Sequence, residues 1–490
     1  MAAINRLVDL YEAPTICYVG FAILGEVVMT GSFRSMGSMG MSVPRPPGSP
    51  ASGAAPGTLL GDLKARDNVT NWRHLAFVWV VIGVTLAAAI EAEGWIRGTG
   101  HSAWWILPLA LATIVLIGAS QHQLGGAIHE GTHYILFKNR RLNELASDWL
   151  AAFPIYTSTY QFRVHHLAHH QFVNDPERDP DIAQLKESGH WLDFPVAHVD
   201  LLRKLLRQLW LPNLVRYTLV RAKYSALGFD QNPYRDETAK PGVWPNRVGI
   251  LFAAAVPGGA IALIAAGRPG AALGAIALSW CAAAIFYARL PEGAFLGTRL
   301  KPVVSHRATA IGRVTFMALM YAALTATEAA TGAPAWGYFG LYWVVPLFST
   351  FALFMVLRQW VQHGNADRGR LTNTRVFLVG PLVRYAVFPW GMDYHLPHHV
   401  YASVPHYRLK DLHQLLLADP EYREKGVIVE GYFGGSAPGA PPTAMSVLGP
   451  AFAPRTREAV HVDNAALEHA EVTGREIIAA RAARSEAGER

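Results

Sequence analysis

The sequence predicts an all-α fold: a polytopic membrane helical bundle with a cytosolic helical cap that carries a histidine-rich metal site. Three observations predict this fold. Apolar residues gather in separate blocks, Lys and Arg concentrate in alternate connections between the blocks, and histidines recur at helical spacing in three clusters. Hydropathy, loop charge and ligand spacing depend on different residues, so the three observations support the fold independently.

The composition is typical of a membrane protein. Hydrophobic residues make up 51% of the 490 residues and charged residues only 16%, which departs from soluble averages. The net charge of +7 arises from Lys and Arg between the apolar blocks, so a membrane surface accounts for it better than nucleic acid does. Cys17 and Cys281 stand in separate apolar stretches without a CxxC pattern, which supports neither a disulfide framework nor a thiolate metal site.

Residues 1–70 are expected to form an apolar segment followed by a flexible linker. The segment Ile16–Met29 is short, is interrupted by Glu26, and has no signal-peptide cleavage pattern. An interfacial helix and an extra span both stay open for it. From Gly31 to Gly61 the chain is rich in Gly, Ser, Pro and Met, a composition that buries too little apolar surface to offset the entropy of ordering.

Six membrane spans are expected in the central part of the chain. Several apolar blocks approach the ~20 residues that a spanning helix requires. Aromatic residues such as Trp104 and Trp336 stand at block ends, where amphipathic rings meet lipid headgroups. The blocks are Leu75–Ile90, Trp104–Ile128, Val248–Ala266, Ala271–Leu290, Ile311–Ala330 and Trp336–Leu357.

Loop charge predicts which side of these spans faces the cytoplasm. The connections 91–103, 267–270 and 331–335 hold only Arg97 and Arg268 as basic residues. Basic residues are frequent in the segments on the other side, which are therefore expected to be cytoplasmic. All three histidine clusters lie in or beside those segments, so one shared site on the cytoplasmic face becomes possible. Residues 432–490 are expected to form a Pro/Gly linker and, from Arg455, a charged tail that is a solvated helix or disordered.

The three histidine clusters have the spacing of metal ligands on helices. Residues three and four apart lie on neighbouring positions of one helical face. Two triplets with the same HxxHH spacing and one HxxxH pair are hard to obtain from surface composition. The clusters are His129 and His133, then His166, His169 and His170, then His395, His398 and His399.

The number of imidazoles discriminates between metals. A tetrahedral zinc site takes four ligands, or three and a water, so eight clustered histidines supply about twice that number. Imidazole also suits iron, and two iron ions with four or five nitrogen ligands each, keeping positions open for dioxygen, use the supply. The sequence therefore favours a pair of iron ions.

The ordered set HxxxH, HxxHH and HxxHH, with spans between the second and third, resembles the membrane fatty acid desaturase superfamily over roughly Asn71 to Gly431. The resemblance implies a desaturase-like domain over residues 71–431, capped by a cytosolic, non-haem dinuclear iron site. Such a site activates dioxygen and abstracts hydrogen from an unactivated carbon. The family usually has a further histidine after the last span in an NxxxH or QxxxH stretch. Residues 359–363, QWVQH, occupy that place, so the resemblance makes His363 a ninth ligand; its alternative is a helix-end cap.

Carboxylates near the clusters are expected to fix the imidazole tautomers by hydrogen bonds. Residues 174–181, NDPERDPD, resemble the acidic stretch that often follows the second histidine box in bacterial members. A solvated turn with Asp before Pro is the alternative for this stretch. The candidates are Asp148, Asp179, Asp181 and Asp393.

The resemblance implies an oxidoreductase that acts on the aliphatic chain of a lipid or fatty acyl substrate, with a fatty acid or acyl-lipid desaturase as the first hypothesis. Lipid hydroxylation, ketolation and fatty acid decarboxylation are outcomes of similar sites in relatives. The electron donor should be a separate protein of the ferredoxin or cytochrome b5 type, because the chain has neither an HPGG haem loop nor a Cys cluster. The basic cytosolic face offers an acidic donor a docking surface.

Two hypotheses from other classes stay open at this point. Residues 129–133 also satisfy HExxH, the pattern of zinc proteases, but a protease leaves both HxxHH triplets without a role. A metal or haem carrier would place histidines at mid-membrane depth, whereas these clusters lie in predicted cytosolic segments.

Overall fold

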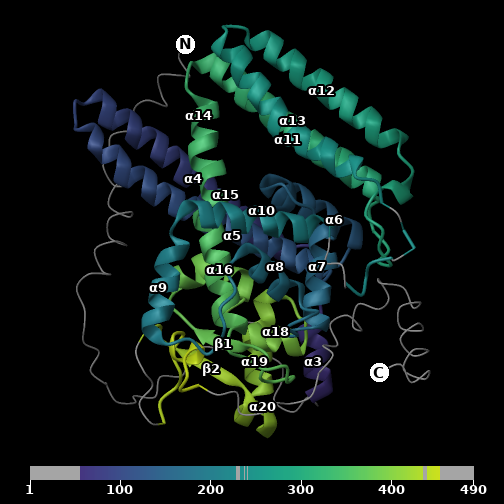
Figure 1. Cartoon of the computed structure of the whole chain (residues 1–490), viewed down its shortest axis with the longest axis vertical. Coiled ribbons are helices and arrows are strands. Elements are labelled where there is room, and N and C mark those ends of the chain that lie inside the picture. Colours follow the sequence, from purple (N-terminus) through teal and green to yellow (C-terminus); the bar gives the residue numbers. More distant parts are fainter. Residues whose placement is uncertain (1–55, 228–231, 237, 240, 434–438, 453–490) are drawn as a thin grey trace, which may run out of the picture. The chain divides into compact units, whose positions relative to one another are not determined.

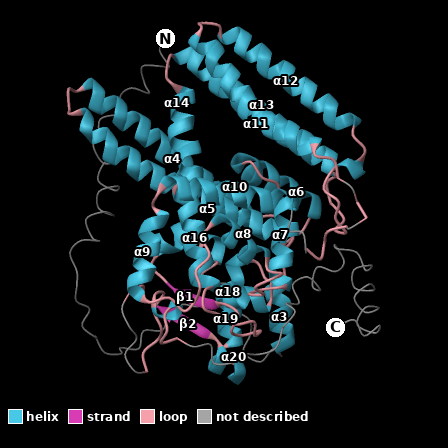
Figure 2. Cartoon of the chain, viewed as in Figure 1, coloured by secondary structure: helices cyan, strands magenta, loops and turns pink. Residues whose placement is uncertain are grey.

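The computed structural model describes residues 56–227, 232–236, 238–239, 241–433 and 439–452. The segment Ile16–Met29, most of the linker Gly31–Gly61 and the tail from Arg455 lie outside the described residues. The regular structure of the described chain is almost entirely helical, as the sequence predicts (Figure 2).

The first half of the described chain runs from α3 to α10, and the second half from α11 to α20 with two strands (Figure 1). The helices of the first half are α3 Pro56–Lys64, α4 Thr70–Gly98, α5 Ile106–Thr132, α6 Arg140–Ser147, α7 Thr159–Gln171, α8 Pro180–Ser188, α9 His198–Gln208 and α10 Leu211–Leu227. The elements of the second half are α11 Trp244–Ala265, α12 Pro269–Arg289, α13 His306–Thr331, α14 Ala335–Phe339, α15 Val345–Phe348, α16 Thr350–His363, β1 Arg375–Leu378, α17 Pro381–Val387, α18 His395–Val400, α19 Leu409–Leu416, α20 Pro420–Lys425 and β2 Val427–Glu430.

Six stretches of the described chain are long and apolar enough to cross a membrane, which confirms the predicted number. Large apolar side chains such as Val80, Leu251 and Leu278 are exposed on them. In a membrane-spanning helix such side chains contact lipid, because every backbone group is already hydrogen-bonded within the helix. The stretches are Thr70–Gly98, Ala103–Thr132, Trp244–Ala265, Pro269–Arg289, His306–Thr331 and Ala335–His363.

Helices α11, α12 and α13 form a layer of their own (Figure 1). Polar side chains join them across the helix interfaces: the Tyr287 hydroxyl donates to the Pro245 carbonyl over 2.8 Å, and the Trp280 indole N–H donates to the Thr315 hydroxyl over 2.9 Å. Such bonds hold spans together where lipid supplies no hydrophobic driving force between helices.

Helix α5 lies at the centre of the remaining spans and carries close contacts at glycines. A Cβ atom on Gly118 would meet the Thr350 hydroxyl and lie 2.8 Å from the Phe351 amide nitrogen. The Thr350 hydroxyl donates to the Ile114 carbonyl over 2.8 Å. The absence of a side chain at Gly118 therefore lets α5 and the sixth span approach with their backbones almost in contact.

The sixth span is one apolar stretch but not one continuous α-helix. Residues Gly340–Val344 form a π-helical turn between α14 and α15, and Ser349 leaves helical geometry at φ −129° and ψ −90° before α16 begins. Pro346 lacks an N–H donor, which accounts for a break in this region. Beyond the break, α16 packs against α5 and ends at His363.

On the side of the spans where α5 and α16 end, short elements gather (Figures 1 and 2). Helices α18, α19 and α20 lie beside a two-stranded parallel sheet, in which Arg375 pairs with Val427 and Leu378 with Glu430. These strands were not predicted from the sequence, because each has only four residues and the pairing joins segments about fifty residues apart.

The close approach at Gly118 predicts a loss of stability when a methyl group is added there. Gly118→Ala should lower the free energy of unfolding by about 1–3 kcal/mol, because α5 and the sixth span must separate. Gly125→Ala is the matched control, since its Cβ would lie 3.8 Å from the Phe351 ring, an ordinary contact distance. Thermal unfolding of the two purified variants checks this, and equal unfolding temperatures would contradict the packing.

Candidate metal centre

Four helices deliver the nine predicted histidines, and all four do so on one side of the spans. The last turn of α5 carries one histidine of the HxxxH pair, and the residue after the helix carries the other. Helix α7 carries the first triplet, and its N-terminus is fixed by the Ser158 side chain, which accepts from the Gln161 amide. Helix α16 ends at His363, and α18 carries the second triplet.

The nine imidazoles assemble into two neighbouring groups that divide both HxxHH triplets. In the group of five, the ligand atoms all lie within 4.8 Å of one another, and the second group has three members at the same spacing. His395 adjoins the second group through contacts of 3.0 Å to His363 and 3.1 Å to His399. The group of five is His129, His133, His166, His170 and His398, and the group of four is His169, His363, His395 and His399.

The helical geometry explains why the triplets divide. Residues four apart differ by about 40° around a helix, and residues three apart by about 60° in the opposite direction. The i, i+4 pair His166 and His170 stays in the group of five, whereas His169 turns to the group of four. In α18 the pair His395 and His399 stays together while His398 crosses to the group of five. The His170 and His399 rings stack with centroids 4.3 Å apart, so the two groups are adjacent.

Hydrogen bonds between the imidazoles do not satisfy the group of five. The Nε2 atoms of His133 and His166 lie 2.9 Å apart, those of His166 and His170 3.0 Å, and those of His170 and His398 3.1 Å. A neutral imidazole nitrogen carries either a proton or a lone pair. These four Nε2 atoms make three contacts, but each nitrogen can take part in only one N–H···N bond. At least one of the three contacts therefore has no hydrogen bond, whereas a metal cation can accept the lone pair of every nitrogen.

His129 shows the same need for a partner. Both of its ring nitrogens are buried and have no hydrogen-bond partner among the described residues. Its ring centroid lies 4.5 Å from those of His166 and His398. Leaving a buried donor or acceptor unpaired costs about 1–3 kcal/mol, and a metal ion among these lone pairs removes that cost.

Three imidazoles outside the spans, those of His166, His395 and His398, have lowered pKa values, which favours the neutral form with a free lone pair. Burial and the neighbouring His129 and His170 keep the pKa of His166 well below its usual range. Burial followed by the neighbouring imidazoles does the same to the pKa of His395 and of His398. In the described chain both groups consist of imidazole alone, a nitrogen donor set that fits iron, zinc, copper or nickel.

Two of the four predicted carboxylates lie against a histidine of the site. Asp179 approaches His169 Nδ1 at 3.0 and 3.1 Å through its two oxygens. It also accepts from the Asp181 amide at the start of α8, as an Asp before Pro does in a turn, but Asp179 is buried and not solvated. Asp181 lies 3.7 Å from His169 Nδ1 and 2.7 Å from Nε2 of His165, which belongs to neither group.

The other two predicted carboxylates make different contacts. Asp148 accepts from the Thr159 amide over 2.8 Å at the N-terminus of α7, and burial raises the pKa of Asp148 to about 7. Asp393 accepts from Arg384 Nε over 2.7 Å. Asp148 therefore contributes by positioning α7, and Asp393 by holding the segment that leads into α18.

The buried ion pair between Arg163 and Glu144, which was not predicted from the sequence, joins α5, α6 and α7 next to the histidines at the end of α5. Arg163 is fully buried and donates to the carbonyls of Gly131 and Thr132 over 2.8 and 2.9 Å, and both of its terminal nitrogens bond the Glu144 carboxylate. Its guanidinium also lies 3.9 Å from the centroid of the Tyr134 ring. Burial opposes the charge, but Glu144 more than offsets it and the pKa of Arg163 is raised.

A second buried arginine fixes the end of α16. Arg375 donates to the carbonyls of Val361 and Gly364 over 2.7 and 2.6 Å, which places a cation at the negative end of the helix. Two residues earlier, the Asn373 carbonyl lies 3.2 Å from Nδ1 of His363. No spacing in the sequence distinguishes Arg163 or Arg375 from the many other arginines, which explains why the pattern analysis missed them.

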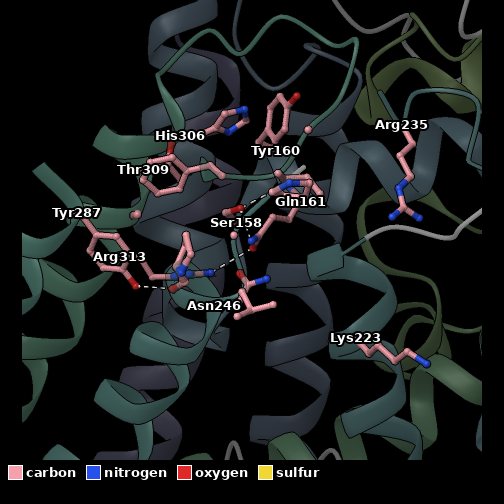
Figure 3. A pocket seen from close by; sticks show the side chains of 18 of the residues that line it. Ser158, Tyr160, Gln161, Lys223, Arg235, Asn246, Tyr287, His306, Thr309 and Arg313 are labelled. Atoms are coloured by element: carbon pink, nitrogen blue, oxygen red, sulfur yellow. Dashed lines mark hydrogen bonds between the residues drawn. The ribbon is translucent and has the colours of Figure 1, made fainter. Parts of the chain in front are cut away.

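A cavity of about 390 Å³ lies between α7, α10 and the ends of α11, α12 and α13 (Figure 3). Figure 3 shows Arg313 reaching towards Gln161, to which it donates over 3.1 Å. A smaller cavity of about 20 Å³ adjoins the imidazoles. Both cavities are lined by α7 and α10: Gln161 and Lys223 face the larger one, and His165 and Arg221 the smaller one.

The fold and these imidazole groups define an integral membrane protein with a buried polyhistidine site that fits a metal. The family described as fatty acid desaturase matches residues 102–294 and 279–430, a stretch that includes all nine histidines and most of the chain. The chain belongs to the fatty acid desaturase family.

Two relatives agree with this family. Dihydrorhizobitoxine desaturase of Bradyrhizobium elkanii is 22% identical over 373 residues, which are 75% of this chain and 81% of that protein. Delta(5) fatty acid desaturase fat-4 of Caenorhabditis elegans is 39% identical over 72 residues, which are 15% of this chain and 16% of that protein. The chain is thus a desaturase-like membrane oxidoreductase.

The ion pair between Arg163 and Glu144 predicts a large effect on stability. Arg163→Met leaves the Glu144 charge buried without its partner, so the free energy of unfolding should fall by about 3–5 kcal/mol. The double variant Arg163→Met/Glu144→Leu removes both charges and should recover part of that loss. Thermal unfolding of the single and double variants measures the difference. A single variant as stable as the unmodified chain would show that the pair does not hold these helices together.

Proposed function

We propose that this chain is a non-haem di-iron, dioxygen-dependent desaturase that acts on the aliphatic chain of a lipid. The observation that carries the proposal is the division of nine imidazoles into adjacent groups of five and four. Two neighbouring nitrogen-rich sites are what a pair of iron ions requires. In this proposal each group holds one ion, and the pair, when bound, supplies dioxygen activation and removal of hydrogen from an unactivated carbon.

The chain's own residues would orient the ligands. Where Nδ1 of His169 donates its proton to Asp179, the Nε2 lone pair is left for a metal. The Asn373 carbonyl has the same effect on His363, whose Nδ1 lies 3.2 Å away. Asp181 would contribute through its contact with His169, whereas Asp148 and Asp393 would act indirectly by holding α7 and the segment before α18.

The larger cavity supports a substrate with a polar end. Lys223, Arg235 and Arg313 line it together with Tyr287 and Phe295, and it lies where three spans begin or end. Helices α7 and α10 line both cavities, so in this proposal they hold the polar end of the lipid on the same two helices that adjoin the imidazoles. The Phe162 ring lines the smaller cavity and lies parallel to the ring of His166, with the two centroids 5.4 Å apart.

Desaturation is the outcome favoured among those open to such a site. The two relatives are named for different substrates, dihydrorhizobitoxine and a fatty acid, but both are named as desaturases. Desaturation is therefore the reaction that both names share. A lipid hydroxylase, ketolase or fatty acid decarboxylase on the same scaffold is the alternative, and product identification distinguishes them.

A zinc protease built on HExxH is disfavoured by the position of its glutamate. One oxygen of the Glu130 carboxylate accepts a hydrogen bond of 3.0 Å from the backbone N–H of His406, which lies 276 residues later in the chain. Glu130 thus holds that segment in place, which is not the role of a general base. Seven further imidazoles would also have no role in such an enzyme. A carrier with histidines at mid-membrane depth is disfavoured because the imidazoles lie at helix ends on one side of the spans.

The proposed orientation places the imidazoles on the cytoplasmic face, since the basic connections lie on their side of the spans. Electrons would come from a separate donor protein of the ferredoxin or cytochrome b5 type, docked on that basic face. A separate assay tests the donor: isolated membranes that contain the chain and are washed free of soluble protein should form product only when a reduced donor is added back.

The proposal predicts a new unsaturated lipid in a host that expresses the chain. His129→Ala, His166→Ala and His398→Ala should each lower the product by at least about 100-fold, because loss of even an indirect metal contact costs 10–100-fold. His101→Ala, an exposed histidine between the first two spans, is the matched control and should leave the product unchanged. Mass spectrometry of host lipids gives the answer, and full product from any of the three variants would refute the site.

A further inference from the structure

Helix α9 exposes an apolar stripe to its surroundings. Val199, Leu202 and Leu206 recur at i, i+3 and i+7 and are 70%, 53% and 57% exposed. Leu209 and Trp210, just beyond the helix, continue the stripe at 55% and 65% exposure. The opposite side of the helix is anchored in the protein core, where Leu201 is buried. A helix facing water normally has polar side chains on its outer side.

Basic side chains border this stripe. With 100° per residue, Arg203 and Arg207 fall on one edge of the apolar face, and Lys204 lies beyond them. Asp200, the single acidic residue of α9, pairs with Arg203 over 2.9 Å. The helix therefore has two cations, Arg203 and Arg207, along one edge of an exposed apolar face, the pattern of a helix that lies in a membrane interface.

The position of α10 places this stripe near the bilayer. Helix α10 follows α9 directly and packs on the sixth span, where the Tyr217 hydroxyl donates to Gln359 over 2.7 Å and the Thr218 hydroxyl to the Leu347 carbonyl over 3.5 Å. Exposed Leu219 continues the apolar surface along α10. Figure 1 shows α9 at the outer edge of the fold, beyond α16.

We propose that the outer face of α9 and residues 209–211 lies in the interfacial region of the leaflet on the histidine side. The apolar stripe enters among the upper acyl chains, and the basic edge contacts anionic headgroups, each near-surface cation adding to the attraction. The surface is thus a lipid-binding one, and it stands independently of the metal and of the reaction.

The docked helix also supports the site from outside. The Val196 amide, two residues before α9, donates to the Leu448 carbonyl over 2.9 Å. The Asn365 side chain, two residues after His363, donates to the carbonyls of Val447 and Phe452 over 2.9 Å each. Segment 446–452 therefore bridges the start of α9 and the end of α16, so a bilayer that holds α9 also steadies this bridge.

The test uses the full chain with Cys17 and Cys281 replaced by Ala and one chain per lipid nanodisc of phosphatidylcholine and phosphatidylglycerol. A bimane fluorophore is placed on Leu206→Cys, and on Glu421→Cys of α20 as a water-exposed control whose side chain is 58% exposed. At position 206, lipids brominated on the acyl chains should quench the fluorophore several-fold more than at 421, and aqueous iodide should quench it several-fold less.

Three outcomes would overturn the proposal. Equal iodide quenching at both positions means that the stripe faces water. Protection of position 206 from iodide without quenching by brominated lipid means that protein covers it, and protection only with two chains per disc identifies a second copy.

For the basic edge, Arg203→Gln/Arg207→Gln should abolish the extra lipid quenching that phosphatidylglycerol gives over phosphatidylcholine alone, and an unchanged difference would remove the headgroup contact.

Discussion

The guanidinium of Arg163 and the carboxylate of Glu144 pair in the interior, at the point where α5, α6 and α7 meet. Burying two charges costs several kcal/mol each, and only good geometry with further hydrogen bonds offsets that cost. The further bonds go to the carbonyls of Gly131 and Thr132, between the two histidines of the HxxxH pair. Since Arg163 stands three residues before His166, the same contacts fix the first triplet against that pair.

Convergence of many neutral imidazoles has a cost of its own, because their lone pairs point at one another. Hydrogen bonds from buried arginines to the carbonyls at the helix ends offset part of this cost by holding the histidine-bearing helices in place. Arg375 holds the carbonyls at the end of α16, as Arg163 holds those at the end of α5. Both arginines also complement the negative end of a helix dipole. The two groups thus rest on the C-termini of two helices that pack on each other along the close approach at Gly118.

Hydropathy predicted the six spans and histidine spacing predicted the candidate ligands, because spanning helices and ligand-bearing helices impose regular patterns on the sequence. The HxxHH spacing was interpreted as one helical face, so the division of each triplet was not predicted, although its i, i+3 and i, i+4 members turn in opposite directions. The four carboxylates were chosen because they are near the histidines in sequence, and only two of them contact a histidine of the site. Asp179 and Asp181 contact His169, whereas Asp148 contacts Thr159 and Asp393 contacts Arg384. Arg163, Arg375 and the short β1–β2 pairing depend on tertiary contacts that leave no local pattern.

The central claim is that the five and four imidazoles hold two iron ions in one centre. Elemental analysis of the purified full chain, expressed with iron and zinc both available, tests it most directly. The account predicts about two iron ions per chain and little zinc, because nine nitrogen donors fill two open iron sites and exceed the four of a tetrahedral zinc. One zinc ion per chain, or a single iron ion that does not rise when iron is in excess, would contradict it.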